Sequence, residues 1–128
     1  MQEIAIIKEE DIKDKIYVIR GLKVMIDSDL AEIYGYTTKA FNQQIRNNAD
    51  RFDEDFMFQL SEDEYSNLRS KFLTSSLEDN YGGRRYLPYV FTEQGIYMLM
   101  TVLKGEKAVE QSKALIRIFK NMKDYFLK

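Results

Sequence analysis

The sequence predicts an α+β fold in which small β-ribbons accompany a helix-turn-helix and a long C-terminal amphipathic helix. Residues 15–20 and 22–26 are rich in Ile, Val and Tyr, a composition typical of short β-strands, and they precede the first helical pattern. Apolar residues recur at helical spacing over residues 106–126, which is enough for a helix of about five turns. The chain of 128 residues has no internal repeat or low-complexity linker, which indicates one domain with one core.

The N-terminal ribbon leads into the first expected helix. Gly21 separates the two strand-like segments and predicts a hairpin turn between them. Asp27 and Ser28 follow, and either side chain is of a type that caps a helix start. The next apolar residues fall at helical spacing as far as Tyr34, and Gly35 is the residue type that ends a helix. We therefore expect the first helix to end at Tyr34.

A second, amphipathic helix is expected directly after this glycine. Thr37 and Thr38 are candidate N-caps, and Phe41 and Ile45 lie four residues apart on one face. The rest of the helix surface is rich in amides and cations, and no acidic residue occurs over residues 37–49. Its polar residues are Lys39, Asn42, Gln43, Arg46 and Asn47.

The later elements follow from local signals. The apolar run at residues 56–60 has the length of a buried strand. Ser61 and Glu64 form a capping-box pattern that predicts a helix after it. Residues 87–91 predict another strand, and Thr92 is a candidate cap for the helix that follows.

Residues 27–48 have the spacing of a helix-turn-helix. Such a motif needs a small residue where the two helices touch, a glycine at the turn and apolar residues that lock the helices together. Ala31 and Gly35 supply the first two. The second helix would enter the major groove, where Asn and Gln can pair with adenine and Arg and Lys with guanine, while Thr37 and Thr38 suit a phosphate. Two ordinary packed helices could give the same spacing, but a merely solvated face in an acidic protein would more often mix Glu with Lys.

A second candidate for DNA contact is the turn at residues 82–85, Gly-Gly-Arg-Arg. It could act as a wing that contacts phosphates or the minor groove, or it could be a solvated hairpin tip. It lacks the Gly-Lys-Ser/Thr ending of a phosphate-binding P-loop. Together the candidate DNA-binding residues are Thr37, Thr38, Lys39, Asn42, Gln43, Arg46, Asn47, Arg51, Arg84 and Arg85.

Composition narrows the possible functions. The net charge of −2 means that any DNA-binding surface must gather its cations on one face. Cysteine and histidine are absent, which excludes thiolate and imidazole metal ligands and the usual general base. The acidic residues at positions 50 and 53–55 could hold a metal for a nuclease, but calcium-loop spacing is missing and a solvated turn is favoured. We expect no enzymatic activity, no metal and no cofactor.

The sequence gives no sign of membrane insertion. No apolar run approaches the roughly 18 residues of a membrane span. The N-terminus carries acidic residues where a signal peptide would carry basic ones. We expect a cytoplasmic protein.

Two stretches, residues 19–60 and 82–99, resemble the phage ORF-six N-terminal domain family, which is related to the KilA-N and Bro-N DNA-binding domains. The likeness covers about residues 19–103. The resemblance implies a phage or prophage regulator, often antirepressor-like, whose module is thought to bind DNA. The residues that match the family's motif are Asp29-Leu30-Ala31, Tyr34-Gly35, Asn42, Arg46-Asn47, Arg51-Phe52 and Phe91-Thr92-Glu93-Gln94-Gly95.

Some of these matches are expected to be structural, with Phe52 and Phe91 as core anchors and Thr92 as a helix cap. We expect residues 1–105 to form the KilA-N/Bro-N-like DNA-binding domain. Residues 106–128 would form a C-terminal helix that belongs to the same unit or makes the seam of a homodimer.

Two classes of function remain open. The first is a regulatory module that binds double-stranded DNA through the helix-turn-helix. The alternative is a protein-protein interaction module that binds a repressor or another phage or host protein, for which an acidic surface and an amphipathic terminal helix would be suitable.

Overall fold

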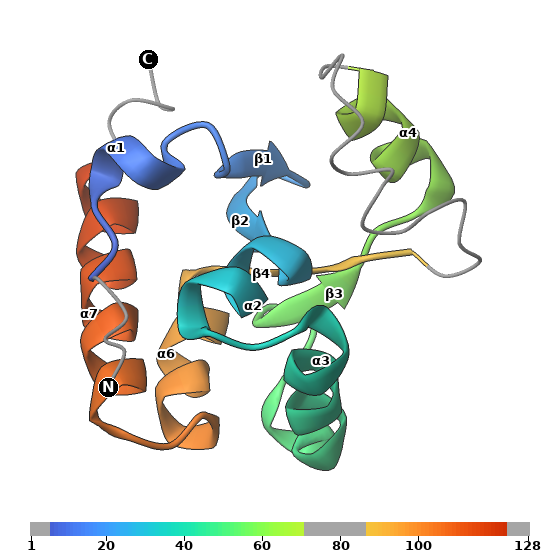
Figure 1. Cartoon of the computed structure of the whole chain (residues 1–128). Coiled ribbons are helices and arrows are strands. Elements are labelled where there is room, and N and C mark those ends of the chain that lie inside the picture. Colours follow the sequence, from blue (N-terminus) through green and yellow to red (C-terminus); the bar gives the residue numbers. More distant parts are fainter. Residues whose placement is uncertain (1–5, 71–86, 123–128) are drawn as a thin grey trace.

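The structure is a computed structural model that describes residues 6–70 and 87–122. It is a mixed α+β fold, as predicted, with helices packed around a four-stranded antiparallel sheet (Figure 1). In chain order the elements are α1 (Glu9–Ile12), β1 (Tyr17–Ile19), β2 (Leu22–Ile26), α2 (Asp27–Tyr34), α3 (Thr38–Asn47), the 3-10 turn η1 (Ala49–Arg51), β3 (Met57–Gln59), α4 (Glu62–Ser70), β4 (Tyr89–Phe91), α6 (Glu93–Val102) and α7 (Glu106–Asn121).

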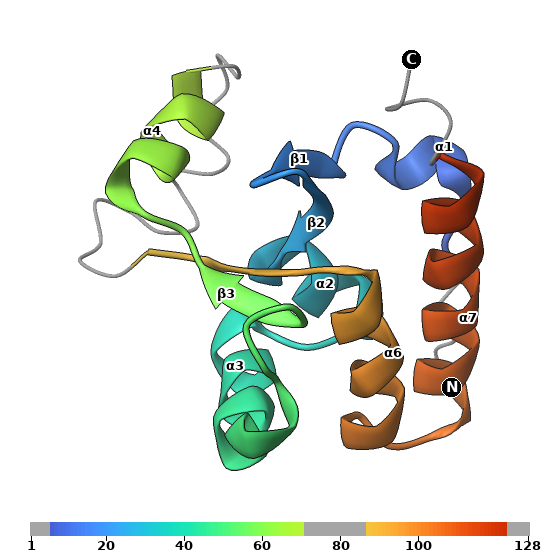
Figure 2. The ribbon, with the colours of Figure 1, turned by 180° about the vertical axis from the view of Figure 1, so that it is seen from behind.

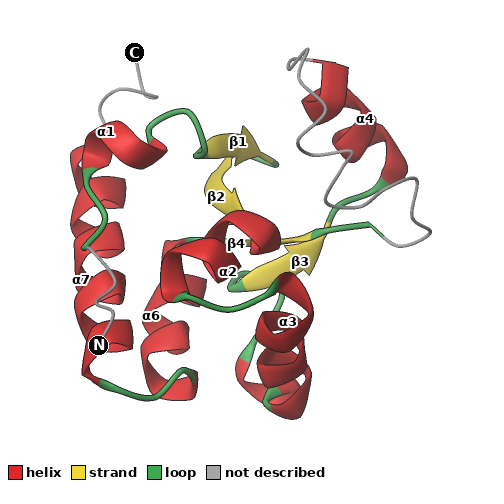
Figure 3. Ribbon diagram, viewed as in Figure 1, coloured by secondary structure: helices red, strands yellow, loops and turns green. Residues whose placement is uncertain are grey.

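The sheet joins two antiparallel strand pairs in the order β1-β2-β4-β3. Its central pair, β2 and β4, is distant in sequence, and Met25 lies opposite Phe91 in that pair. On the other side of β4, Phe58 of β3 lies opposite Val90. Figure 3 shows the strands between α6 and α7 on one side and α4 on the other. The sheet therefore connects the N-terminal hairpin to the C-terminal helices.

Alternation along the strands divides the interior into two clusters. Met25 and Phe91 point to the larger cluster, which they share with buried residues of α2, α3, α6 and α7. Their neighbours Ile26 and Val90 point to the smaller cluster, which includes Leu68 of α4. In the view from behind, α4 again stands apart from the other helices (Figure 2). Each face of the sheet is thus covered by a different set of helices.

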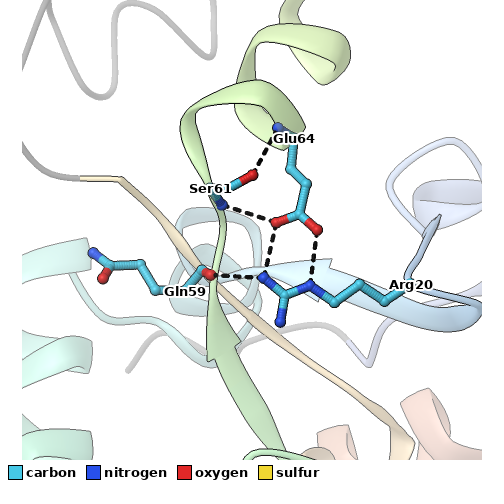
Figure 4. A network of polar contacts seen from close by, with 4 residues as sticks. All are labelled: Arg20, Gln59, Ser61 and Glu64. Atoms are coloured by element: carbon cyan, nitrogen blue, oxygen red, sulfur yellow. Dashed lines mark hydrogen bonds and ion pairs between the residues drawn. The ribbon is translucent and has the colours of Figure 1, made fainter.

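Arg20 and Gly21 form the turn between β1 and β2. Both have left-handed backbone conformations, with φ of 56° and 77°, which is the pattern of a type I′ hairpin turn. Arginine rarely adopts this region, and its side chain is held by several contacts. Its guanidinium lies 4.1 Å from the centre of the Phe58 ring and donates from Nε to Glu64 Oε2 at 2.8 Å and from Nη2 to Glu64 Oε1 at 3.0 Å (Figure 4).

Glu64 also caps α4, as the sequence predicted. Its backbone N–H donates to Ser61 Oγ at 3.1 Å, and its carboxylate accepts from the Ser61 N–H at 2.8 Å (Figure 4). This is a complete capping box. The hydrogen bond from Arg20, together with these local contacts, lowers the pKa of Glu64 to about 2.

The C-terminal helix α7 packs on its own domain, against α6 and α2. Its apolar stripe includes Leu115 and Phe119, both fully buried. Two buried polar residues tie it to α2: Gln111 Nε2 donates to the Ile33 carbonyl at 2.9 Å, and Ser112 Oγ lies 2.6 Å from the Tyr34 hydroxyl in a hydrogen bond. The apolar face of α7 is therefore occupied within the chain.

The short helix α1 and the 3-10 turn η1 were not expected from the sequence. α1 has acidic residues throughout its first turn and buries Ile12 alone, so it shows no amphipathic repeat. It lies beside one end of α7 in both views of the ribbon (Figures 1 and 2). It is the surrounding contacts, including Ile12 in the core, that fix it.

The expectation that Asp27 or Ser28 caps α2 was wrong. The cap position is Ile26, which makes no side-chain cap bond, and β2 passes directly into α2. Asp27 is instead fully buried and forms hydrogen bonds across the fold. Thr37, rather than Thr38, caps α3, and Thr92 caps α6 as expected. Strand β2 has the bounds expected from the sequence, whereas β1, β3 and β4 are shorter than the runs that predicted them. Residues 123–126 of the expected terminal helix lie outside the described residues.

Gly95 in the first turn of α6 sits against the backbone of Phe56. A Cβ atom built at this position would lie 2.2 Å from the Phe56 carbonyl oxygen. The same carbonyl accepts a hydrogen bond from the Thr92 N–H at 3.0 Å, so it cannot move without breaking that bond. Only glycine allows α6 to start this close to the segment before β3.

Replacing Gly95 with alanine should destabilise the fold by about 1–3 kcal/mol, because the methyl group must displace backbone rather than a side chain. Thermal unfolding should show a midpoint several degrees lower. Gln94→Ala, at an exposed position of the same turn, is the control and should change stability by less than about 0.5 kcal/mol. Equal midpoints for both variants would contradict the close approach.

Glu64 should give the protein a stability component that is lost in acid. Its pKa is lowered in the folded state, so its contribution is complete above the ordinary carboxyl value of about 4.3 and is lost as the pH falls towards 2. The difference in unfolding midpoint between the natural protein and Glu64→Gln should be largest at neutral pH and shrink below about pH 4.5. A difference that is independent of pH would show that Glu64 acts without its charge. Glu62→Gln, in the same helical turn, is the control.

Candidate nucleic-acid interface

Helices α2 and α3 meet in the arrangement that the sequence predicted. Gly35 ends α2 with a φ of 83°, and the Tyr36 N–H reaches back to the Ala31 carbonyl at 2.8 Å. Thr37 then begins α3 by accepting a hydrogen bond from the Ala40 N–H at 3.0 Å. The short turn from Gly35 to Thr37 is the length of a helix-turn-helix connection.

Aromatic packing fixes the angle of α3 against the rest of the domain. Phe41, fully buried on the inner face of α3, stacks on Tyr34 with ring centres 6.4 Å apart. Its ring also meets Phe91 of β4 edge-on at 5.7 Å, and Phe52 meets Phe91 from another side at 5.8 Å. Ile45 is buried one turn after Phe41. Phe52 and Phe91 are thus core anchors, as expected, and α3 has one fixed inner face.

A buried carboxylate joins three elements behind α3. Asp27 is fully buried at the start of α2, and its Oδ2 accepts from Asn42 Nδ2 at 3.0 Å and from the Tyr89 N–H of β4 at 3.3 Å. A buried carboxylate is tolerated where it is fully hydrogen-bonded. Asn42, a candidate DNA contact, is half-buried and helps to hold α3 in place.

The outer face of α3 carries a chain of hydrogen bonds between exposed side chains. Arg46 Nη2 donates to Gln43 Oε1 at 2.8 Å, and Gln43 Nε2 donates to Asn47 Oδ1 at 3.0 Å. Lys39 is exposed one turn before Gln43. The structure therefore places four of the candidate residues on one accessible surface.

A groove of about 630 Å³ runs between α3 and the strands β3 and β4. Three of the candidate residues, Lys39, Asn42 and Arg46, line its α3 side, and residues of the two strands line the other side. Apolar atoms dominate its lining, and Arg46 and Lys39 supply the charge. The lining residues are Lys39, Asn42, Ile45, Arg46, Ala49, Met57, Gln59 and Tyr89.

The other candidates lie elsewhere or outside the described residues. Thr37 has its hydroxyl engaged as the cap, and Thr38 is half-buried. Arg51 is exposed beyond the end of α3 and donates to Thr101 Oγ1 of α6 at 3.1 Å. The candidate wing residues Arg84 and Arg85 fall outside the described part of the chain.

Sequence reasoning missed the strand wall of the groove. Met57, Gln59 and Tyr89 read as ordinary strand residues, and only the pairing of β3 with β4 places them opposite α3. The role of Asp27 was missed for the same reason, since its partner Tyr89 is 62 positions away. No local signal indicates either arrangement.

The helix before α3 contains a partly buried acid, Asp29. Burial raises the pKa of Asp29 to about 6, an effect that Lys15 opposes and Glu32 and Asp27 reinforce.

Among the described residues, no group of three or more acidic side chains is arranged to hold a metal ion. None of the described helices is both long and apolar enough to cross a bilayer.

Comparison with known proteins places the chain in a family. The sequence model of the ORF6N domain family matches residues 14–102 of the chain. This span contains the helix-turn-helix, the groove and the four strands of the sheet. No curated protein and no solved structure matches the chain. The chain therefore belongs to the ORF6N family, a phage-associated domain related to KilA-N and Bro-N.

Proposed function

We propose that this protein is a non-enzymatic regulator of phage or prophage origin that binds double-stranded DNA by placing α3 in the major groove. The main support is the outer face of α3, where Lys39, Gln43, Arg46 and Asn47 are accessible on a helix whose inner face is locked into the core. In a helix-turn-helix the second helix is held in this way and presents its outer face to the major groove.

Local charge supports this proposal in an acidic protein. No acidic residue occurs over residues 37–49, so the charges that α3 itself presents are those of Lys39 and Arg46, together with the positive N-terminal end of the helix. The acids at positions 50 and 53–55 begin only after α3 has ended. With so few cations, affinity should depend on a small number of phosphate contacts.

The regulatory role is proposed to be antirepressor-like, as the family relation suggests. A homodimer would strengthen DNA binding by presenting two copies of α3. Because the apolar stripe of α7 packs within its own domain, such a dimer would use the outer face of α7, where Glu110, Lys113 and Arg117 are exposed.

The alternative is a protein-interaction module that binds a repressor or another phage or host protein. Its support is the exposed acidic segment between α3 and β3, Asp53–Asp55, which could meet a basic partner. The apolar face of α7 is not available for such a partner without unpacking the domain. The two proposals differ in whether α3 or the acidic segment is the binding surface.

A salt-titrated DNA-binding assay tests the DNA proposal. The logarithm of the association constant should fall linearly with the logarithm of salt concentration, with a slope of about 0.9 per phosphate neutralised. Arg46→Ala and Lys39→Ala should each weaken binding, and a substitution that removes a phosphate contact should also reduce the slope by about one, whereas one that removes a base contact should not.

Lys13→Ala is the matched control, because Lys13 is an exposed cation near α1 that the proposal leaves outside the interface. It should bind like the natural protein. Binding that is insensitive to salt and to both α3 substitutions would contradict the DNA proposal. Loss of binding to a repressor on neutralising Asp53–Asp55 would instead support the alternative.

A further inference from the structure

The hydrogen-bonded chain on α3 has a fixed direction. A guanidinium can only donate hydrogen bonds, so the Gln43 atom that faces Arg46 must be the carbonyl oxygen. The amide nitrogen of Gln43 therefore faces Asn47 and donates to its oxygen. Asn47 is left with its NH2 group directed away from Gln43. We call this chain, Arg46, Gln43 and Asn47, the α3 relay.

The α3 relay uses both polar atoms of Gln43. Reading adenine in the major groove requires a glutamine to offer its oxygen and its nitrogen together to one base. In the relay the oxygen accepts from Arg46 at 2.8 Å and the nitrogen donates to Asn47 at 3.0 Å. Gln43 lies at the centre of the exposed face, opposite the buried Phe41 and Ile45, yet its polar atoms are directed along the helix surface.

Arg46 keeps its own capacity to read a base. Nη2 carries two hydrogens, and the bond to Gln43 uses one of them. The second Nη2 hydrogen forms, with the N–H of a neighbouring guanidinium nitrogen, a pair of parallel donors that can bind two acceptors at once. In the major groove the base edge that presents two acceptors, O6 and N7, is that of guanine. The free end of the relay at Asn47 also offers donors.

We propose that Gln43 is a positioning residue that aims the Arg46 guanidinium at the major-groove edge of a guanine. The inference rests on the proposed DNA-binding function and deepens it by naming the base and by separating the residue that reads from the residue that orients. Without Gln43, Arg46 keeps its charge but gains rotational freedom, so discrimination falls while phosphate attraction remains.

The test is selection of DNA sites from a library of duplexes with a randomised core, read out as base preference at each position. The natural protein should prefer guanine at one position of its binding site, or at one position of each half-site if it binds as a dimer. Arg46→Ala should reduce that preference roughly tenfold, the value of one bidentate contact. Gln43→Leu should reduce preference at the same position by about threefold and leave neighbouring positions unchanged.

A double substitution makes the test independent of folding effects. If Gln43 acts through Arg46, adding Gln43→Leu to Arg46→Ala should cause no further loss at the guanine position. Lys39→Ala, on the same face but outside the relay, should weaken all sequences alike. Gln43→Ala should give the same result as Gln43→Leu. Thermal unfolding midpoints equal to that of the natural protein would show that these variants keep the fold.

Two other results would overturn the inference. A change at a different base position in Gln43→Leu would mean that Gln43 reads a base itself, and uniform weakening by Arg46→Ala would mean that Arg46 contacts a phosphate. Either outcome overturns the inference while leaving DNA binding intact. Absence of salt-dependent DNA binding by the natural protein would overturn the proposed function as well.

Discussion

The placement of α3 depends on the buried carboxylate of Asp27. It lies where β2 passes directly into α2, and it bonds to Asn42 on α3 and to the Tyr89 N–H on β4. A buried carboxyl group without hydrogen-bond partners would be costly, so the bonds that Asp27 makes from α2 hold α3 and β4 to it. The helix that we propose reads DNA is thereby fixed to the sheet by a polar contact as well as by the Phe41 ring.

The rest of the fold supports this junction from two sides. Alternation in β2 and β4 sends Met25 and Phe91 towards the helices and Ile26 and Val90 towards α4. Helix α7 covers the first cluster with its buried apolar residues, and Gln111 and Ser112 attach it to α2 by hydrogen bonds. The contact of Arg20 with Glu64 closes the second by tying the first hairpin to α4. The α3 face is left as an accessible surface on a rigid support.

Much of this arrangement could be predicted from the sequence because it is encoded locally. Gly35 needs a left-handed backbone, Thr37 and Thr92 cap their helices, and Ser61 with Glu64 forms a capping box. These signals lie within a few residues of what they determine, and so the helix bounds were largely correct.

Long-range features could not be predicted in the same way. Aspartate is both a common cap and a good buried acceptor, and the positions of its partners Asn42 and Tyr89 in the fold decide which role Asp27 takes. The strand order places Met57 and Gln59 beside α3 without any local mark. The same holds for Gly95, whose need for glycine comes from Phe56, which belongs to another segment.

The most direct test of the central claim is to map amide chemical shifts by NMR while a DNA duplex is added to the protein. The account predicts that the largest changes fall on α3, from Lys39 to Asn47, and that α1 and the inner face of α7 change little. Changes concentrated on α7 or on the acidic segment after α3, with α3 unaffected, would contradict it.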